Sequence, residues 1–512
     1  MTNPLLLQIG NWNPQLLREI RGRLKPRSIF ATVAVVVIAH GLIFLGIWQS
    51  FENGTPNPFK DLFWLMMWLI PYGLYFIGGY SLVNDLTTEE QRGTLNFVRL
   101  SPRPSPTILL GKLLGVPLLF YLAIALFVPL HLLSALIGGI SLSFILSFYL
   151  MLIAEGIFIF CLAMLFALVG ASQSVVKTQP ATYSVTFAIL TLMFFSPAVL
   201  FWNRAVLWSH FPSIQEYTEP PELQWFYFPV GQNVWVGHGF TLATLFVGMV
   251  LMWTVLKRRL KNPAATLISK RQSYALTACL ELLIVGFFVP GIQDIDFSEG
   301  PVVALYVLNM VLFLVLIFAL SPTRQALLDW RYYESPQIPH GATLMWGERS
   351  PAPAAIAINL LIVGVVVIPL LLWAATGREN LLSLLFVALG FSSQALCYAV
   401  LTQRILAAKV KNPWAWALGT LIIIIAVPLI VVSILSQSLG PIVTTFIWAV
   451  MGFQVILFAP EMVSQFNIAI LILLSVATLA MQWIILGLLA WHLQHFLSRM
   501  GSQEDRAIAQ PN

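Results

Sequence analysis

Long apolar runs separated by short polar segments dominate the pattern of the chain. Each run has about 20 residues, the length at which an α-helix crosses the roughly 30 Å hydrocarbon layer of a membrane. We count twelve such runs, at residues 29–49, 62–83, 113–137, 144–168, 181–202, 236–256, 274–290, 301–320, 354–374, 381–401, 414–435 and 468–492. The pattern therefore predicts an all-α, polytopic membrane protein with about twelve transmembrane helices.

One further apolar run, residues 441–459, does not fit this count, because a crossing there would move Arg499 and Arg506 to the opposite side of the membrane. We interpret this run as re-entrant or interfacial. Backbone of that kind persists at membrane depth only where protein or water satisfies its polar groups. The run is therefore expected to pack against other spans.

The composition leaves no room for a large soluble domain. The 512 residues are 59% hydrophobic and 9% charged, with a mean hydropathy of +0.85. The net charge of +6 would suggest a nucleic-acid partner in a soluble protein, but here the lipid bilayer is the expected partner and no nucleic acid is expected. The three cysteines lie in apolar runs and are expected to be packing residues: Cys161, Cys279 and Cys397.

The Lys and Arg residues set the orientation, because cytoplasmic loops carry an excess of them. With the N-terminus inside and twelve crossings, all of the 27 Lys and Arg residues fall on the inside except Lys60, Arg204 and Arg378. We therefore expect a multi-pass protein of the plasma (inner) membrane with both termini in the cytoplasm.

The N-terminal segment is amphipathic. Apolar and basic residues alternate at helical spacing, so that the two kinds lie largely on opposite faces. The apolar face holds Leu16, Leu17, Ile20 and Leu24, and the basic face holds Arg18, Arg21, Arg23 and Lys25. Residues 1–28 are thus expected to contain a cytoplasmic helix that lies on the membrane surface.

Two parts of the chain resemble each other at a shift of 249 positions. Thr94-Leu95 then aligns with Thr343-Leu344, and Ser101-Pro102 aligns with Ser350-Pro351, each pair preceding a long apolar run. We infer two parallel six-helix halves, at residues 29–260 and 261–495, followed by a cytoplasmic tail at 496–512. An even number of crossings per half gives the halves the same orientation.

The polar segment between the second and third runs, residues 85–112, has a distinctive motif. The acidic pair Glu89 and Glu90 is followed by Arg92, Gly93, Thr94 and Leu95, then by a Ser-Pro turn and by Leu109-Leu110-Gly111-Lys112-Leu113. The motif, together with Asn13-Pro14 and the basic run after it, resembles the permease subunits of ABC type-2 exporters. An ordinary basic loop that is held inside by its charge is the alternative.

The resemblance implies a function for this segment. It would be a coupling loop, in which Glu89, Glu90, Arg92, Gly93, Thr94 and Leu95 contact one or more ABC ATP-binding subunits and transmit their motion to the spans. The corresponding segment of the second half, residues 327–340, lacks the acidic pair and Arg-Gly, so its contact with an ATPase is in doubt. One chain would supply both halves of the pore, although a homodimer is not excluded.

The chain itself has no motif for nucleotide hydrolysis. A phosphate-binding loop needs a glycine, four residues and then Gly-Lys-Ser or Gly-Lys-Thr. Gly111-Lys112 does not complete such a loop, because Pro106 stands where the motif needs its first glycine and Leu113 stands where it needs Ser or Thr. We expect no catalytic residues, no metal and no cofactor on this chain, with ATP and Mg²⁺ on the partner ATPase.

Two carboxyl groups lie within apolar runs, which is costly and marks them as candidates. Glu155 is near the middle of the fourth run and Glu281 near the middle of the seventh. They either line the translocation path or the interface between the halves, or are structural groups buried between helices. The aromatic run 225–228 is expected to be an interfacial anchor or a short re-entrant hairpin.

The function that this sequence favours is a membrane-spanning permease subunit of an ATP-driven exporter. The apolar spans favour a hydrophobic or amphipathic substrate. The alternatives are a secondary transporter driven by an ion gradient and a membrane scaffold subunit that transports nothing.

Overall fold

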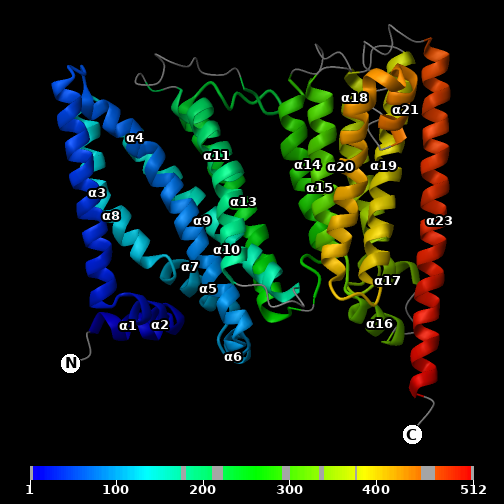
Figure 1. The fold of residues 1–512 in the computed structure, drawn as a ribbon, viewed down its shortest axis with the longest axis horizontal. Helices are drawn as coiled ribbons and strands as arrows, with labels where there is room; N and C mark the ends of the chain where they lie inside the picture. Colours follow the sequence, from blue (N-terminus) through cyan, green and yellow to red (C-terminus); the bar gives the residue numbers. More distant parts are fainter. Residues whose placement is uncertain are drawn as a thin grey trace. The chain divides into compact units, whose positions relative to one another are not determined.

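The computed structural model of the protein consists of helices (Figure 1). It describes residues 4–173, 180–209, 211, 223–263, 265–290, 300–333, 340–374, 378–450 and 467–508. Within these ranges no strand forms, and the only β-type pairing is an isolated bridge between Trp225 and Phe228. The prediction of an all-α fold is confirmed.

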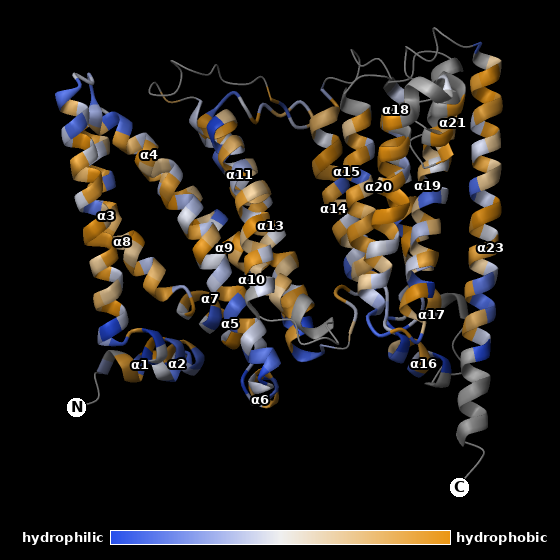
Figure 2. Cartoon of the chain, in the orientation of Figure 1, coloured by the Kyte–Doolittle hydropathy of each residue, from blue (hydrophilic) through white to orange (hydrophobic). Residues whose placement is uncertain are grey.

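Ten helical stretches among the described residues are long and apolar enough to cross a membrane. They are Pro26–Glu52, Pro58–Gln91, Leu118–Ile137, Leu142–Val169, Ser184–Trp208, Val234–Lys261, Val303–Leu320, Pro353–Leu370, Leu385–Leu406 and Ala469–Arg499. Figure 2 shows hydrophobic residues along these helices and hydrophilic residues where α1, α2 and α6 gather. The protein is thus a multi-pass membrane protein.

The other two expected spans are also helical. One lies in α14 (Lys270–Phe288), which carries charged and polar residues on one face, and the other in α20 (Pro413–Leu439), whose apolar described part is Pro413–Pro428. The number of crossings stays at the predicted twelve only if both are counted.

The chain forms two compact units, which are described separately below. Unit 1 comprises Met1–Leu223 and Pro229–Pro263, and unit 2 comprises Gln224–Phe228 and Ala264–Asn512. The helices of unit 1 are α1 (Pro4–Trp12), α2 (Pro14–Arg23), α3 (Pro26–Glu52), α4 (Pro58–Gly73), α5 (Gly79–Gln91), α6 (Thr94–Leu100), α7 (Ser105–Gly115), α8 (Leu118–Ile137), α9 (Leu142–Gln173), α10 (Pro180–Leu190), α11 (Ser196–Trp202) and α13 (Val234–Lys261).

Proline and asparagine mark where several helices of unit 1 begin. Asn13 and Asn57 cap α2 and α4 through their side chains, and in each case a proline follows at the first helical position. Proline is favoured there because its missing N–H would have no partner within the helix. Three π-helical turns interrupt the long helices: η1 (Leu74–Gly78), η2 (Thr191–Phe195) and η3 (Asn203–Trp208).

Unit 2 contains α14 and α20 together with α15 (Gly300–Leu320), α16 (Arg324–Tyr333), α17 (His340–Trp346), α18 (Pro353–Ala374), α19 (Arg378–Leu406), α21 (Pro441–Val450) and α23 (Ile468–Ile508). Helix α23 has 41 residues and continues through most of the expected tail. It packs along α19, and α21 contacts α20 and α23. Residues 451–459, the second part of the run predicted to be re-entrant, lie outside the described residues.

Candidate functional site

The N-terminal helix α2 is held against α7 by close backbone packing. Gly111 and Gly115 lie one turn apart on α7, and a Cβ at Gly111 would approach Gln15 Cβ to 2.8 Å. A Cβ at Gly115 would overlap the side chain of Glu19. The Asn13 side chain accepts a hydrogen bond from Leu16 N (3.0 Å) and donates one to Thr107 O (2.9 Å). Small residues at this spacing allow two helices to approach closely.

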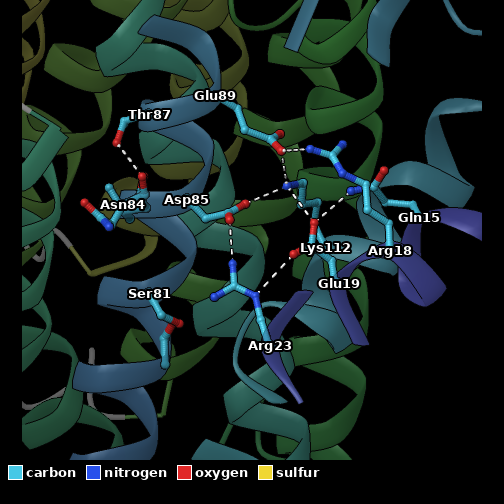
Figure 3. A network of polar contacts seen from close by, with 12 residues as sticks. Gln15, Arg18, Glu19, Arg23, Ser81, Asn84, Asp85, Thr87, Glu89 and Lys112 are labelled. Atoms are coloured by element: carbon cyan, nitrogen blue, oxygen red, sulfur yellow. Dashed lines mark hydrogen bonds and ion pairs between the residues drawn. The ribbon is translucent and has the colours of Figure 1, made fainter. Parts of the chain in front are cut away.

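Between these two glycines, Lys112 extends into a cluster of three carboxylates (Figure 3). Its Nζ lies 2.9 Å from Glu19 Oε1 on α2, 2.6 Å from Asp85 Oδ2 on α5 and 2.9 Å from Glu89 Oε1 on α5. The side chain of Lys112 is only 1% exposed. One buried ammonium group therefore joins three helices.

Two arginines of α2 complete the cluster. Arg18 Nη2 lies 2.9 Å from Glu89 Oε1, and Arg23 Nη2 lies 2.5 Å from Asp85 Oδ1. Arg23 Nε also pairs with Glu19 Oε2 at 3.2 Å. Three cations thus balance three carboxylates, which is what makes burial of so many charges tolerable.

The pKa values of two members outside the membrane-spanning segments reflect this balance. Burial raises the pKa of Glu19, but the charges and hydrogen bonds of Lys112 and Arg23 outweigh burial, so the pKa lies below its ordinary value of 4.5. Burial lowers the pKa of Lys112, but the charges of Asp85, Glu19 and Glu89 outweigh it, so the pKa lies above 10.5. Each group is therefore held in its charged form.

The carboxylates of Glu19, Asp85 and Glu89 lie close enough together to ligate a metal ion. The Lys112 ammonium contacts all three, however, and already supplies the positive charge at their centre. The cluster is therefore a helix-joining ion network and does not fit a metal site.

The six residues predicted to couple to an ATPase surround the turn between α5 and α6. Glu89 belongs to the ion network, and Leu95 is fully buried. Thr94 Oγ1 donates to Glu89 O at 3.1 Å. Gly93 has φ +72°, a left-handed conformation that glycine adopts without steric cost, and exposed Arg92 caps the end of α5.

Glu90 makes a separate ion pair at this turn. Its Oε2 lies 2.8 Å from Arg99 Nη2, and Arg99 Nε donates to Leu260 O at 3.0 Å. Leu260 is near the end of α13, so Arg99 ties the short helix α6 both to α5 and to α13. A displacement of α6 would thus be transmitted directly to α5 and α13, each of which belongs to a candidate membrane span.

A groove of about 460 Å³ opens beside α6. Its lining comes from α2, α6 and α7 and comprises Pro14, Gln15, Arg18, Thr94, Phe97, Val98, Ser101, Arg103, Thr107 and Ile108. On α6, Phe97 is 77% exposed and Leu100 is 83% exposed. The surface therefore combines exposed apolar side chains with two arginines.

The two intramembrane carboxyl groups have different surroundings. Glu155 on α9 accepts hydrogen bonds from Tyr75 Oη (2.9 Å) and Asn203 Nδ2 (2.8 Å), which belong to η1 and η3. Glu281 on α14 is fully buried, and neither of its oxygens has a hydrogen-bond partner among the described residues. A place for either residue on a translocation path or between the halves stays a prediction.

The aromatic run 225–228 forms a tight turn on α14. Phe226 N donates to Gly286 O at 2.8 Å, and Trp225 Nε1 donates to Leu283 O at 3.2 Å. Phe226 and Tyr227 both have positive φ, which is rare for aromatic residues. The turn resembles the expected hairpin more than a simple anchor, and whether it is re-entrant stays a prediction.

Sequence reasoning did not find the centre of the ion network, because Lys112 was considered only as part of the resemblance motif and of a rejected phosphate-binding loop. Asp85 with Glu89 and Glu19 with Arg23 are spaced four residues apart, which places each pair on one helix face. That spacing, and the glycines on either side of Lys112, were the available signals.

These features define the class of the chain: a multi-pass, all-helical membrane protein with an ion network at the ends of its first helices. Comparison with family models, with curated proteins and with solved structures finds no match.

Proposed function

We propose that the chain is the permease subunit of an ATP-driven ABC type-2 exporter and works with a separate ATP-hydrolysing subunit. The partner would bind ATP and Mg²⁺, and the cargo would be hydrophobic or amphipathic. The protein would lie in the plasma membrane with both termini in the cytoplasm, and its two units would be parallel six-helix halves of one pore.

The observation that carries this proposal is that Lys112 joins the three segments on which the resemblance rests. Asn13 begins the helix that packs on Gly111, and Glu89 of the acidic pair contacts Lys112 from α5. Residues from all three segments of the motif thus meet in a single assembly. An ordinary basic loop would not require this combination.

The groove beside α6 suits the expected partner. A helix or loop of the ATPase with an apolar side chain and an acidic residue would find Phe97 and Val98 next to Arg18 and Arg103. Movement of that partner would press on α6, and the contacts of Arg99 with Glu90 and Leu260 would pass the displacement to α5 and α13.

Secondary transport driven by an ion gradient is a second candidate, and Glu281 favours it. A carboxyl group that is buried in a helix without a hydrogen-bond partner is a common feature of ion-coupled sites.

The test is purification of the tagged full-length chain from its native membrane in mild detergent, followed by mass identification and an ATPase assay. We expect a stoichiometric nucleotide-binding subunit and ATP hydrolysis. Phe97→Asp should remove both, because it places a charge on the exposed apolar part of the groove. Tyr227→Asp is the matched control, since Tyr227 is an exposed aromatic residue far along the chain from α6.

Recovery of the chain alone, without ATPase activity, would contradict the proposal and favour gradient-driven transport or a scaffold role. Equal loss of the partner in both variants would show that the groove is not the docking site.

A further inference from the structure

Helix α14 of unit 2 carries a continuous line of buried polar residues. Lys270, Ser273, Thr277 and Glu281 follow one another at spacings of three or four residues and are each at most 2% exposed. Such spacing places them on one helix face, about one turn of 5.4 Å apart. A polar face of this kind inside a membrane protein is costly unless it has a function.

Two residues of the line, Ser273 and Thr277, are joined to α18 by hydrogen bonds. Asn359 on α18 donates to Ser273 Oγ at 3.1 Å and accepts from Thr277 Oγ1 at 2.8 Å. Ser273 Oγ also donates to Lys270 O at 2.7 Å. The polar side chains of α14 and α18 therefore form a linked path from Ser273 to Thr277, and Ser273 ties this path to the first turn of α14 at the Lys270 carbonyl.

Lys270, at the start of this path, is buried without a counter-charge. Its Nζ donates to Leu344 O, to Ser350 Oγ (2.6 Å) and to Pro351 O (3.1 Å), and no carboxylate among the described residues pairs with it. Burial accordingly lowers the pKa of Lys270 to about 8. The amine can thus exchange a proton near neutral pH.

Glu281, one turn beyond Thr277, lacks a donor. The side chain of Asn309 on α15 is close enough to influence the carboxyl group, but neither Glu281 oxygen has a hydrogen bond of normal geometry among the described residues. Asn309 Oδ1 is also buried and without a donor. The unsatisfied atoms here are all acceptors, and a single proton on Glu281 would supply the missing donor.

Among the described residues, the elements packed against α14 bring no other charge to this position. Helix α18 contains no titratable residue, and the only one in α15 is Tyr306, which donates to Gln394 on α19. The segment 224–228 brings the exposed Tyr227. The described side chains of α17 are uncharged. A buried carboxylate with no cation near it favours the neutral, protonated form.

We propose that Glu281 is a proton-binding site, reached from the Lys270 end of α14 along the polar face formed by Ser273, Thr277 and Asn359. A hydronium ion loses a proton and becomes water, and the carboxylate of Glu281 gains that proton and becomes a carboxylic acid. This inference does not depend on the ATP-driven function proposed above.

The test is infrared spectroscopy of the purified full-length protein at neutral pH. The spectrum of the wild type minus that of Glu281→Gln isolates the carbonyl band of Glu281. We expect a protonated-carboxyl band that shifts when the sample is moved into D₂O. In Thr277→Val, which keeps the side-chain shape but removes the hydroxyl, that shift should be at least tenfold slower.

The variants have matched controls. Ser392→Ala removes a hydroxyl that bonds only within its own helix, α19, and should leave the rate of the shift unchanged. Absence of the band would show that Glu281 is ionised and would overturn the proposal. A shift equally fast in Thr277→Val and the wild type would overturn the proposed path.

Discussion

Replacing Lys112 by Met should detach the N-terminal helix α2 from α7. The substitution keeps most of the side-chain volume but removes the cation from three carboxylates, each of which is less than a fifth exposed. Loss of one partner from a buried ion pair costs about 3–5 kcal/mol, because a buried charge is left without compensation. Arg18 and Arg23 still contact the carboxylates, so the lower value, about 3 kcal/mol, is expected.

This cost should appear as local opening of α2. A helix of 10 residues is unstable by itself, so α2 unfolds when it leaves α7. A change of about 3 kcal/mol raises the opening equilibrium by roughly a hundredfold. Hydrogen–deuterium exchange of the α2 amides measures that equilibrium. Helix α9, with which Lys112 forms no ion pair or hydrogen bond among the described residues, should be unaffected.

Lys25→Met is the matched control, because Lys25 is exposed and forms no ion pair among the described residues. Its α2 amides should exchange at the wild-type rate. Unchanged exchange in Lys112→Met, or an equal increase in both variants, would refute the reasoning that the ion network holds α2 in place.

Two further predictions concern the same region. Glu19 contributes fully to the docking of α2 above its ordinary pKa of 4.5, and this contribution is lost as the pH falls through its lowered pKa in the folded protein. Lys112 contributes fully below its ordinary pKa of 10.5, and this contribution is lost as the pH rises through its raised pKa in the folded protein. A spin-label distance between α2 and α7 should therefore stay constant across this window and lengthen beyond both ends. Gly93→Ala should destabilise the α5–α6 turn by about 1 kcal/mol, because Ala disfavours φ +72°, whereas Gly93→Asn should cost less. The rate of protease cleavage at the turn would measure the destabilisation. Equal cleavage rates for the Ala and Asn variants would contradict the prediction.

The apolar runs predicted most of the helices, because a span of about 20 apolar residues has few other stable conformations in a membrane. The amphipathic pattern of the N-terminal segment also predicted that Arg18 and Arg21 lie on the exposed face of α2. In both cases neighbouring residues in the sequence are enough for the prediction, because the length and periodicity of the pattern indicate the helix and its exposed face.

The contacts of Lys112 could not be predicted in this way. Its partner Glu19 is 93 residues away in the chain, and nothing in the local pattern indicates which helices meet. The turn over Gly286 is a second example. Phe226 and Tyr227 adopt a left-handed backbone that aromatic residues disfavour, and only the packing of Trp225 against α14 explains it.

Helix α23 has a mechanical consequence. Its 41 residues extend for about 60 Å, roughly twice the thickness of the hydrocarbon layer. Phe496 and Leu497 pack on a small core of Leu327, Leu328 and Ala407, and Arg404 of α19 stacks on the Phe496 ring. That contact lies about 18 Å from the end of α23 at Ile508 and about 42 Å from its start at Ile468, so a tilt of α23 about the contact would move the Ile468 end more than twice as far as the Ile508 end.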